Sequence, residues 1–157
     1  HSLWFTNISK EEQEVLLEEI GIVKKESVTE MDLKKACILD PFAEKTLSPE
    51  DDFDYYVFGG ILGDNPPTKK TDELITSKVK WESRNIGKGQ FPTDNAFYVV
   101  KKITEGKKFS DFKFQDGLTI VIDEGEEVEL PFRYVIVDGK PLISAKLLQH
   151  ITENPGF

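Results

Sequence analysis

The feature that most constrains the fold is the alternation of short apolar segments with short polar, helix-prone segments over the first two thirds of the 157 residues. The apolar segments span only a few residues and stop at glycine, proline or aspartate, as buried strands do. Strands that alternate with helices are typical of an α/β fold with mainly parallel strands. We therefore predict one domain over residues 1–157, with a mainly parallel sheet that carries helices on both faces.

Local patterns place the individual elements. Ser9 and Glu12 fit a capping box that opens a helix, and Thr93 with Asp94 fits the N-terminus of the most regular helix. Asp138-Gly139 fits a hairpin turn. The predicted strands cover residues 3–5, 36–39, 54–58, 79–85, 112–115, 118–122 and 129–137, and the predicted helices cover 9–20, 48–51, 68–75, 93–106 and 144–153.

Composition excludes several classes of protein. Twenty Lys+Arg against 29 Asp+Glu give a net charge of −9, which argues against a protein that grips nucleic acid through its phosphates and suits a small-molecule site or a basic partner. Cys37 is the single cysteine, so we expect a core residue, no internal disulfide and no metal site. No apolar run approaches the ~20 residues of a spanning helix, and no signal-peptide pattern is present, so we expect a cytoplasmic protein without a membrane partner.

A glycine-rich segment follows the predicted strand 54–58. Gly59, Gly60 and Gly63 enclose the apolar pair Ile61-Leu62, and Asp64 ends the segment. The spacing matches neither the dinucleotide fingerprint nor the phosphate-binding P-loop. Glycines let backbone approach a ligand closely, so the segment suits a neutral ring such as adenine. The alternative is a tight turn without any ligand.

Two further segments carry unusual residues at strand ends, where α/β sheets bind their ligands. At residues 84–94 a flexible loop leads into a helix start, where Asp94 either satisfies the helix terminus or faces a cationic ligand group. At residues 129–135 Pro131 indicates an edge position, and Phe132 with Tyr134 could form a pocket wall.

These segments together carry a family resemblance. Residues 54–64, followed by Pro66-Pro67, resemble the first knot loop of SPOUT-class methyltransferases. More narrowly, they are similar to the small family that contains a yeast methyltransferase of a small-subunit ribosomal protein arginine and archaeal proteins described as predicted RNA methyltransferases. Residues 37–41, 84–96, 130–135 and 139–141 match in the same order, so the resemblance covers about residues 36 to 143.

The resemblance implies a trefoil knot in the C-terminal half and S-adenosylmethionine as cofactor, with its adenine held mostly by backbone. The family's opening strand and helix are not found before Leu3, so an N-terminal βα unit is expected to be missing from the numbered chain. The residues implied to bind the cofactor are Leu39, Asp40, Pro41, Gly59, Gly60, Ile61, Leu62, Gly63, Arg84, Thr93, Pro131, Phe132, Arg133 and Tyr134.

The acceptor is expected to be an arginine, whose permanent positive charge requires carboxylates. Asp64 and Asp94 are the leading catalytic candidates, with Asp40 and Glu129 behind them. The acidic run 123–129 fits either a solvated turn or a docking edge for a basic partner, expected to be a small-subunit ribosomal protein. RNA methylation and a non-catalytic SPOUT-like binding module stay as alternatives, and a monomer is favoured over a dimer.

Overall fold

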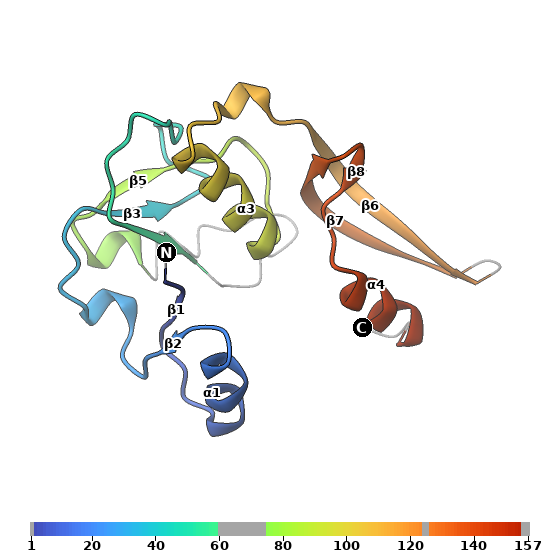
Figure 1. The fold of residues 1–157 in the computed structure, drawn as a ribbon, viewed down its shortest axis with the longest axis horizontal. Helices are drawn as coiled ribbons and strands as arrows, with labels where there is room; N and C mark the ends of the chain where they lie inside the picture. Colours follow the sequence, from blue (N-terminus) through green and yellow to red (C-terminus); the bar gives the residue numbers. More distant parts are fainter. Residues whose placement is uncertain (1, 60–74, 124–125, 155–157) are drawn as a thin grey trace.

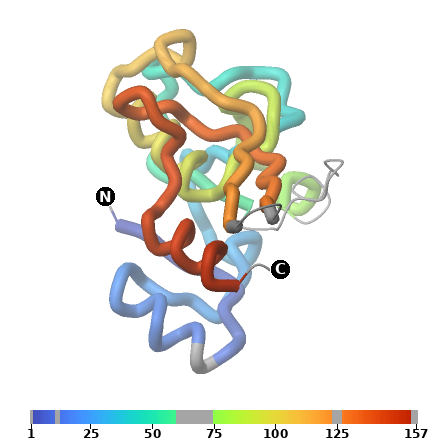
Figure 2. The backbone as a smooth tube through the Cα atoms, turned by 90° about the vertical axis from the view of Figure 1, so that its right-hand side faces the viewer, coloured from blue at the N-terminus to red at the C-terminus, as the bar shows by residue number. Residues whose placement is uncertain are grey.

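The computed structural model describes residues 2–59, 75–123 and 126–154 and has three parts (Figure 1): an N-terminal unit, a central parallel sheet with one long helix, and a β-hairpin followed by a C-terminal helix. In both Figure 1 and Figure 2 the N-terminal unit lies at the opposite end of the molecule from the 3-10 helix η3 (Phe109–Asp111). Among the described residues, no helix is long and apolar enough to cross a membrane.

The N-terminal unit is a small βαβ motif. Strand β1 (Trp4–Phe5) pairs in parallel with β2 (Ile22–Val23), and α1 (Glu11–Glu18) connects them. The predicted capping box at Ser9 is wrong, because Lys10 is the N-cap of α1 and makes no side-chain capping bond. Backbone bonds from Asn7 and Ile8 to Glu26 and Lys24, which follow β2, tie the chain to that segment up to this point.

A capping box does form further along the chain. Ser27 accepts a hydrogen bond from the Thr29 N–H, and Glu30 accepts one from the Ser27 N–H, which opens the 3-10 helix η1 (Val28–Glu30). The same pairing rule therefore holds in this chain, but at Ser27 and not at Ser9.

The central sheet has the strand order β4-β3-β5, with all three strands parallel. They are β3 (Ala36–Leu39), β4 (Tyr55–Phe58) and β5 (Glu82–Arg84), which confirms the first two predicted strands and shortens the third. Leu39 lies opposite both Phe58 and Arg84, so the three strands end level with one another. Every residue of β3 is buried, as a central strand without polar positions requires.

Helix α3 (Thr93–Thr104) lies between this sheet and the hairpin (Figure 1). Its buried face consists of Asn95, Val99, Val100 and Ile103, which recur at helical spacing. The largest core cluster joins this face to β3 and to the hairpin strand that ends at Val137, and its buried members are Cys37, Leu39, Leu47, Ile86, Val99, Val100, Ile103, Phe112 and Val135.

The C-terminal sheet is antiparallel, which corrects the prediction of a mainly parallel sheet. Strands β6 (Phe114–Asp123), β7 (Glu126–Val137) and β8 (Lys140–Pro141) are its members, and β6 and β7 are the longest strands described. Two predicted strands merge into β6 because a bulge at Gly117, with φ of 75°, continues the pairing. Both residues of the Asp138-Gly139 turn have positive φ, which confirms the predicted hairpin turn.

The other described helical segments are short. Helix α4 (Ala145–Glu153) confirms the predicted helix at 144–153 and begins after Ser144, whose hydroxyl accepts the Leu147 N–H at 3.0 Å. Residues 48–51 form a hydrogen-bonded turn instead of the predicted helical turn, and a 3-10 helix η2 (Thr76–Lys78) precedes β5. The predicted helix at 68–75 lies almost wholly outside the described residues. Among the described α-helices, α3 is the one with a substantial contact to the parallel sheet, through β4. The predicted helical cover of the second face stays a prediction.

Candidate functional site

The site begins at the level ends of the parallel strands. Immediately after β3, Asp40 is only 5% exposed, and its N–H donates to the carbonyl of Arg84 at 3.0 Å. Its carboxylate accepts the Phe42 N–H at 2.9 Å and the Thr76 hydroxyl at 3.4 Å. These bonds turn the chain sharply at exposed Pro41, so Asp40 closes the strand end as a buried carboxylate.

Arg84, which ends β5, is held by protein groups. Its guanidinium pairs with Asp51 at 2.8 Å and with Glu82 at 2.9 Å, and it lies 5.0 Å from the ring centre of Phe53. Burial alone would raise the pKa of Asp51, but hydrogen bonds from Arg84 and from the Ser48 N–H lower this pKa overall. Arg84 therefore anchors the sheet to the 48–53 turn, and its predicted contact with a cofactor stays a prediction.

The N-terminus of α3 presents two exposed polar side chains, Thr93 and Asp94. The predicted capping role of this pair is wrong, because Pro92 is the N-cap and no side-chain capping bond forms there. Asp94 instead accepts two bonds from its neighbour Asn95, from the N–H at 2.8 Å and from Nδ2 at 3.1 Å. Its carboxylate is thus fixed in place yet open to solvent.

Asn95 connects α3 to the hairpin. Its side chain is completely buried, its Oδ1 accepts the Val135 N–H at 2.9 Å, and its Nδ2 donates to the carbonyl of Leu142 at 2.9 Å. Both main-chain groups would otherwise be left without these bonds in the interior, at a cost of about 1–3 kcal/mol each. One residue therefore sets the position of the helix N-terminus against β7 and the segment after β8.

Arg133 fixes the loop that leads into α3. Its guanidinium pairs with Asp116 at 2.6 Å and also donates to the carbonyl of Lys88, while its N–H donates to the carbonyl of Gln90 at 2.7 Å. Hydrogen bonding to Arg133 lowers the pKa of Asp116. A side chain at Gly89, whose φ is 114°, would lie within 3.1 Å of the guanidinium, so glycine permits this close approach.

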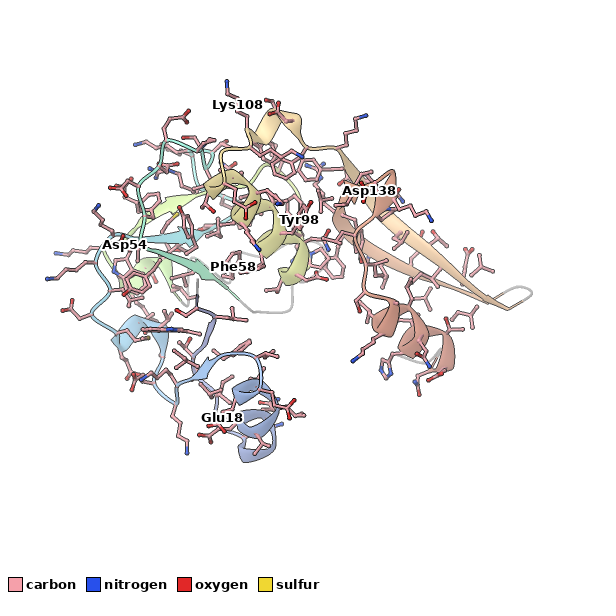
Figure 3. The ribbon with its side chains drawn as sticks, in the orientation of Figure 1. Glu18, Asp54, Phe58, Tyr98, Lys108 and Asp138 are labelled. Carbon is pink, nitrogen blue, oxygen red and sulfur yellow. The ribbon has the colours of Figure 1, made fainter. Side chains whose placement is uncertain are left out.

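Aromatic side chains close the region from two sides. Figure 3 shows Phe58 beside α3 at the end of β4, where its ring centre lies 6.0 Å from that of Phe97. Tyr134 on β7 is only 3% exposed, and burial, with the nearby charge of Asp94, raises the pKa of its hydroxyl. Phe58 at the end of β4 and Tyr134 within β7 thus flank the same helix terminus.

We call this region the strand-end junction, made of residues 39–40, 58–59, 93–95 and 132–134. It contains all described members of the predicted site except three. Arg84 and Pro41 face other groups, and Pro131 is exposed on β7, opposite the bulge of β6. Predicted residues Gly60, Ile61, Leu62, Gly63 and Asp64 lie outside the described residues.

Sequence reasoning missed Asn95, Phe97 and Asp116, although a polar residue on the apolar face of a helix could have indicated Asn95.

The charges at the junction determine what it can hold. Both arginines of the predicted site, Arg84 and Arg133, are already paired with carboxylates, whereas Asp94 is exposed. Such a region favours a ligand that carries positive charge and an apolar ring over one that carries phosphates. Among the described residues, no group of three or more His, Cys, Asp or Glu side chains could hold a metal ion.

Cys37 has no catalytic geometry. It is fully buried in β3, and burial raises the pKa of its thiol to about 12. A thiol with this pKa holds almost no thiolate at neutral pH, so the residue serves the core, as predicted.

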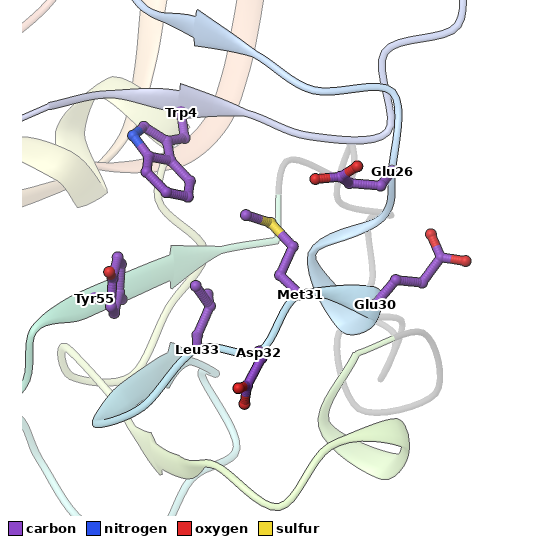
Figure 4. Close-up of a pocket in the computed structure, with 7 residues that line it drawn as sticks. All are labelled: Trp4, Glu26, Glu30, Met31, Asp32, Leu33 and Tyr55. Carbon is purple, nitrogen blue, oxygen red and sulfur yellow. The ribbon is translucent and has the colours of Figure 1, made fainter.

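The structure also contains two cavities away from the junction. The larger, of about 580 Å³, lies between the N-terminal unit and the central sheet (Figure 4). The smaller, of about 390 Å³, lies between the 46–50 turn and η3. Neither includes a residue of the strand-end junction.

Comparison with known proteins gives a consistent match. Residues 1–156 match the family described as Protein arginine N-methyltransferase SFM1-like. The protein arginine N-methyltransferase SFM1 of Saccharomyces cerevisiae is 41% identical over 125 residues, which are 76% of this chain. The chain spans 59% of the length of that yeast protein.

Solved structures agree with this match. The crystal structure of the yeast arginine methyltransferase SFM1 complexed with SAM is similar at a TM-score of 0.84 and 33% identity, over 97% of this chain and 77% of that one. The same yeast protein complexed with SAH gives a TM-score of 0.84 and 34% identity, over 95% of this chain and 80% of that one. A further structure, described as a novel protein arginine methyltransferase, is similar at a TM-score of 0.80 and 33% identity, over 98% of this chain and 85% of that one.

Proposed function

We propose that this chain, which belongs to the SFM1-like protein arginine N-methyltransferase family, transfers a methyl group from S-adenosylmethionine to an arginine of a basic protein. The observation that carries the proposal is the match of nearly the whole chain to relatives solved with S-adenosylmethionine and with its demethylated product. The strand-end junction supports it, because an exposed carboxylate beside aromatic rings suits a cofactor that combines positive charge with adenine.

The residues that would hold the cofactor are those of the strand-end junction, together with the glycine segment that follows β4. When bound, S-adenosylmethionine supplies a methyl group on a sulfonium, which is already an activated leaving group. The chain therefore needs no nucleophile of its own, and its tasks are to orient the acceptor and to exclude water. Asn95 and Arg133 contribute by keeping α3, its preceding loop and β7 in one arrangement.

Asp94 has the chemistry that an arginine acceptor requires. A guanidinium stays protonated in water, and carboxylates bind it with two parallel hydrogen bonds. In the reaction the acceptor nitrogen forms a bond to the methyl carbon as the sulfur–carbon bond breaks, and one proton leaves that nitrogen. We assign to Asp94 the orientation of the guanidinium and the acceptance of this proton, with Asp64 as the second candidate.

The net charge of −9 supports a basic protein as substrate in preference to RNA. On the described part of the hairpin, Glu127 and Glu129 are exposed on β7 opposite Val121 and Thr119 of β6. These carboxylates would attract a ribosomal protein and repel phosphates. As part of the same proposal, we place the chain in the SPOUT class, acting as a monomer, with a trefoil knot in its C-terminal half.

Incubation of the protein with S-adenosylmethionine and a basic ribosomal protein, followed by mass spectrometry of the peptides, tests the proposal. Methylation of arginine is the expected result, and Gly60→Val is expected to abolish cofactor binding in calorimetry while the chain stays folded. Methylation of another residue type, or no binding of S-adenosylmethionine by the folded wild type, would contradict it.

A further inference from the structure

The larger cavity has a floor made of apolar and aromatic side chains. Trp4 and Tyr55 contribute rings whose centres are 6.0 Å apart, and Met31 and Leu33 point into the space beside them (Figure 4). Tyr55 belongs to β4, whereas Trp4 belongs to β1, so the cavity lies where the N-terminal unit meets the central sheet. Aromatic faces and a flexible methionine suit the alkyl stem and the cationic head of a long side chain.

The rim of the cavity is acidic. Glu26, Glu30 and Asp32 line it, and none of the described lining residues is basic. Glu30 caps η1, but the carboxylates of Glu26 and Asp32 form no hydrogen bond or ion pair with any described residue. Two carboxylates are therefore available to a cation at the edge of an apolar floor.

The nitrogen of the Trp4 indole is not part of the cavity surface. Nε1 is buried and has no hydrogen-bond acceptor within the described part of the chain, so a ligand in the cavity does not reach it. Trp4 therefore offers a bound side chain the face of its ring and no hydrogen bond.

The position of the cavity relates it to the strand-end junction. Tyr55 and Phe58 are the two ends of β4, three residues apart, which corresponds to about 10 Å along a strand. Side chains three residues apart in a strand point to opposite faces of the sheet, and β4 is an edge strand of the described sheet, so a segment that reaches both must pass around this edge and needs more than the roughly three residues of a straight path. A protein segment of that greater length could place one basic side chain in the cavity while a nearby arginine lies at the junction.

We propose that the Trp4–Tyr55 cavity is a docking subsite for an arginine or lysine side chain of the protein substrate, separate from the arginine that is methylated. The inference rests on the proposed function only in taking the partner to be a basic protein. The alkyl stem of the bound arginine or lysine would pack on the rings of Trp4 and Tyr55, and its positively charged end would lie near the carboxylates of Glu26 and Asp32. The phosphates of RNA would be repelled at the same place.

The first test is the double variant Glu26→Gln/Asp32→Asn, which keeps Glu30 and its capping bond intact. We expect the KM for a basic protein substrate to rise about fivefold at low salt, with kcat and the affinity for S-adenosylmethionine unchanged. The effect should shrink as salt rises. The control Glu18→Gln/Glu44→Gln removes two exposed charges elsewhere and should leave all three quantities unchanged. An unchanged KM in the cavity variant, or an equal change in the control, overturns the proposal.

A binding test separates this inference from the proposed function. Trp4 and Trp81 are the two tryptophans, so Trp81→Phe leaves Trp4 as the sole indole reporter. We expect a short oligoarginine peptide to change Trp4 fluorescence, and Tyr55→Leu or the double variant to weaken this binding several-fold. Peptide binding with no methyl transfer would overturn the proposed function alone. Methyl transfer with no fluorescence response, or with a response that RNA reproduces, would overturn the docking subsite.

Discussion

The strand-end junction and the N-terminal unit differ in how their side chains are used. Around the junction, Ile38, Asn95, Val99 and Ile103 are completely buried, and Val99 and Ile103 belong to the core cluster. In residues 2–35, no described side chain is buried, and Val15, Leu16 and Ile20 of the N-terminal unit are all more than 60% exposed. The junction thus gains its geometry from burial, whereas the N-terminal unit leaves apolar and acidic groups open.

This difference in burial indicates that the two regions have different roles. Methyl transfer requires acceptor and cofactor groups in a fixed arrangement, which a buried and cross-linked region provides. Docking of a partner requires side chains that are still accessible, which the acidic rim of the Trp4–Tyr55 cavity provides. We therefore expect changes at the junction to affect stability or turnover, and changes in the N-terminal unit to affect the affinity for the protein partner.

The largest expected effect comes from one substitution made in both regions. Ile103→Ala removes a completely buried side chain and should lower the free energy of unfolding by about 2–5 kcal/mol. Ile20→Ala removes the same atoms from a residue that is 64% exposed and should change the free energy of unfolding by less than about 0.5 kcal/mol. Urea unfolding monitored by circular dichroism measures both, and equal losses would show that the two regions do not differ in packing.

Asn95→Ala should weaken the junction by about 2–4 kcal/mol, because it leaves the Val135 N–H and the Leu142 carbonyl without partners. Thr104→Ala, at the exposed end of the same helix, is the matched control and should change the unfolding free energy little. Amide hydrogen exchange at Val135 should accelerate in the Asn95 variant alone. Full protection of that amide would mean that Asn95 does not hold the hairpin.

Asp94→Asn should reduce turnover by roughly a hundredfold, because it keeps the side-chain oxygen that accepts from Asn95 but removes the charge that binds a guanidinium. Its unfolding temperature should stay near that of the wild type. Asp138→Asn is the control, since asparagine suits the positive φ of that turn equally well. Wild-type turnover in the Asp94 variant would leave this residue with a structural role only.

The smallest expected effect concerns pH. The pKa of Asp51 is lowered in the folded chain, so its pairing with Arg84 adds stability above the ordinary carboxyl range and loses it as pH falls through the folded pKa. Asp51→Asn should cost about 1 kcal/mol at pH 7 and progressively less as the pH falls below about 4, so that the cost at about pH 2 is much smaller. Unfolding curves at both values check this. A cost that does not depend on pH would assign the effect to packing.

Local sequence signals were sufficient for several elements. The apolar run of β3, the Asp138-Gly139 turn and the helix after Ser144 each depend on neighbouring residues alone, and all three are present as predicted. The capping prediction at Ser9 also depended on neighbouring residues alone, but it failed because of contacts with residues distant in the sequence. Ser9 does not cap α1 because backbone bonds from Asn7 and Ile8 tie the chain to the segment after β2 and the helix begins only at Glu11, and no nearby pattern reveals those bonds.

The candidate site shows the same limit. Sequence placed Asp94 and Tyr134 in one region, and the structure places both at the strand-end junction. It could not show that Arg84 is committed to Asp51 or that Arg133 is committed to Asp116, because these partners are 33 and 17 residues away in sequence. Asn95 was missed because a bond to a strand 40 residues away decides its importance.

The central claim is that the acceptor is a protein arginine. Small ribosomal subunits treated with the protein and methyl-labelled S-adenosylmethionine test it most directly, because they offer basic proteins and RNA in the same reaction. We expect the label in the protein fraction, on arginine, and its loss when Asp94→Asn replaces the wild type. Label in the ribosomal RNA, with none in protein, would contradict the account.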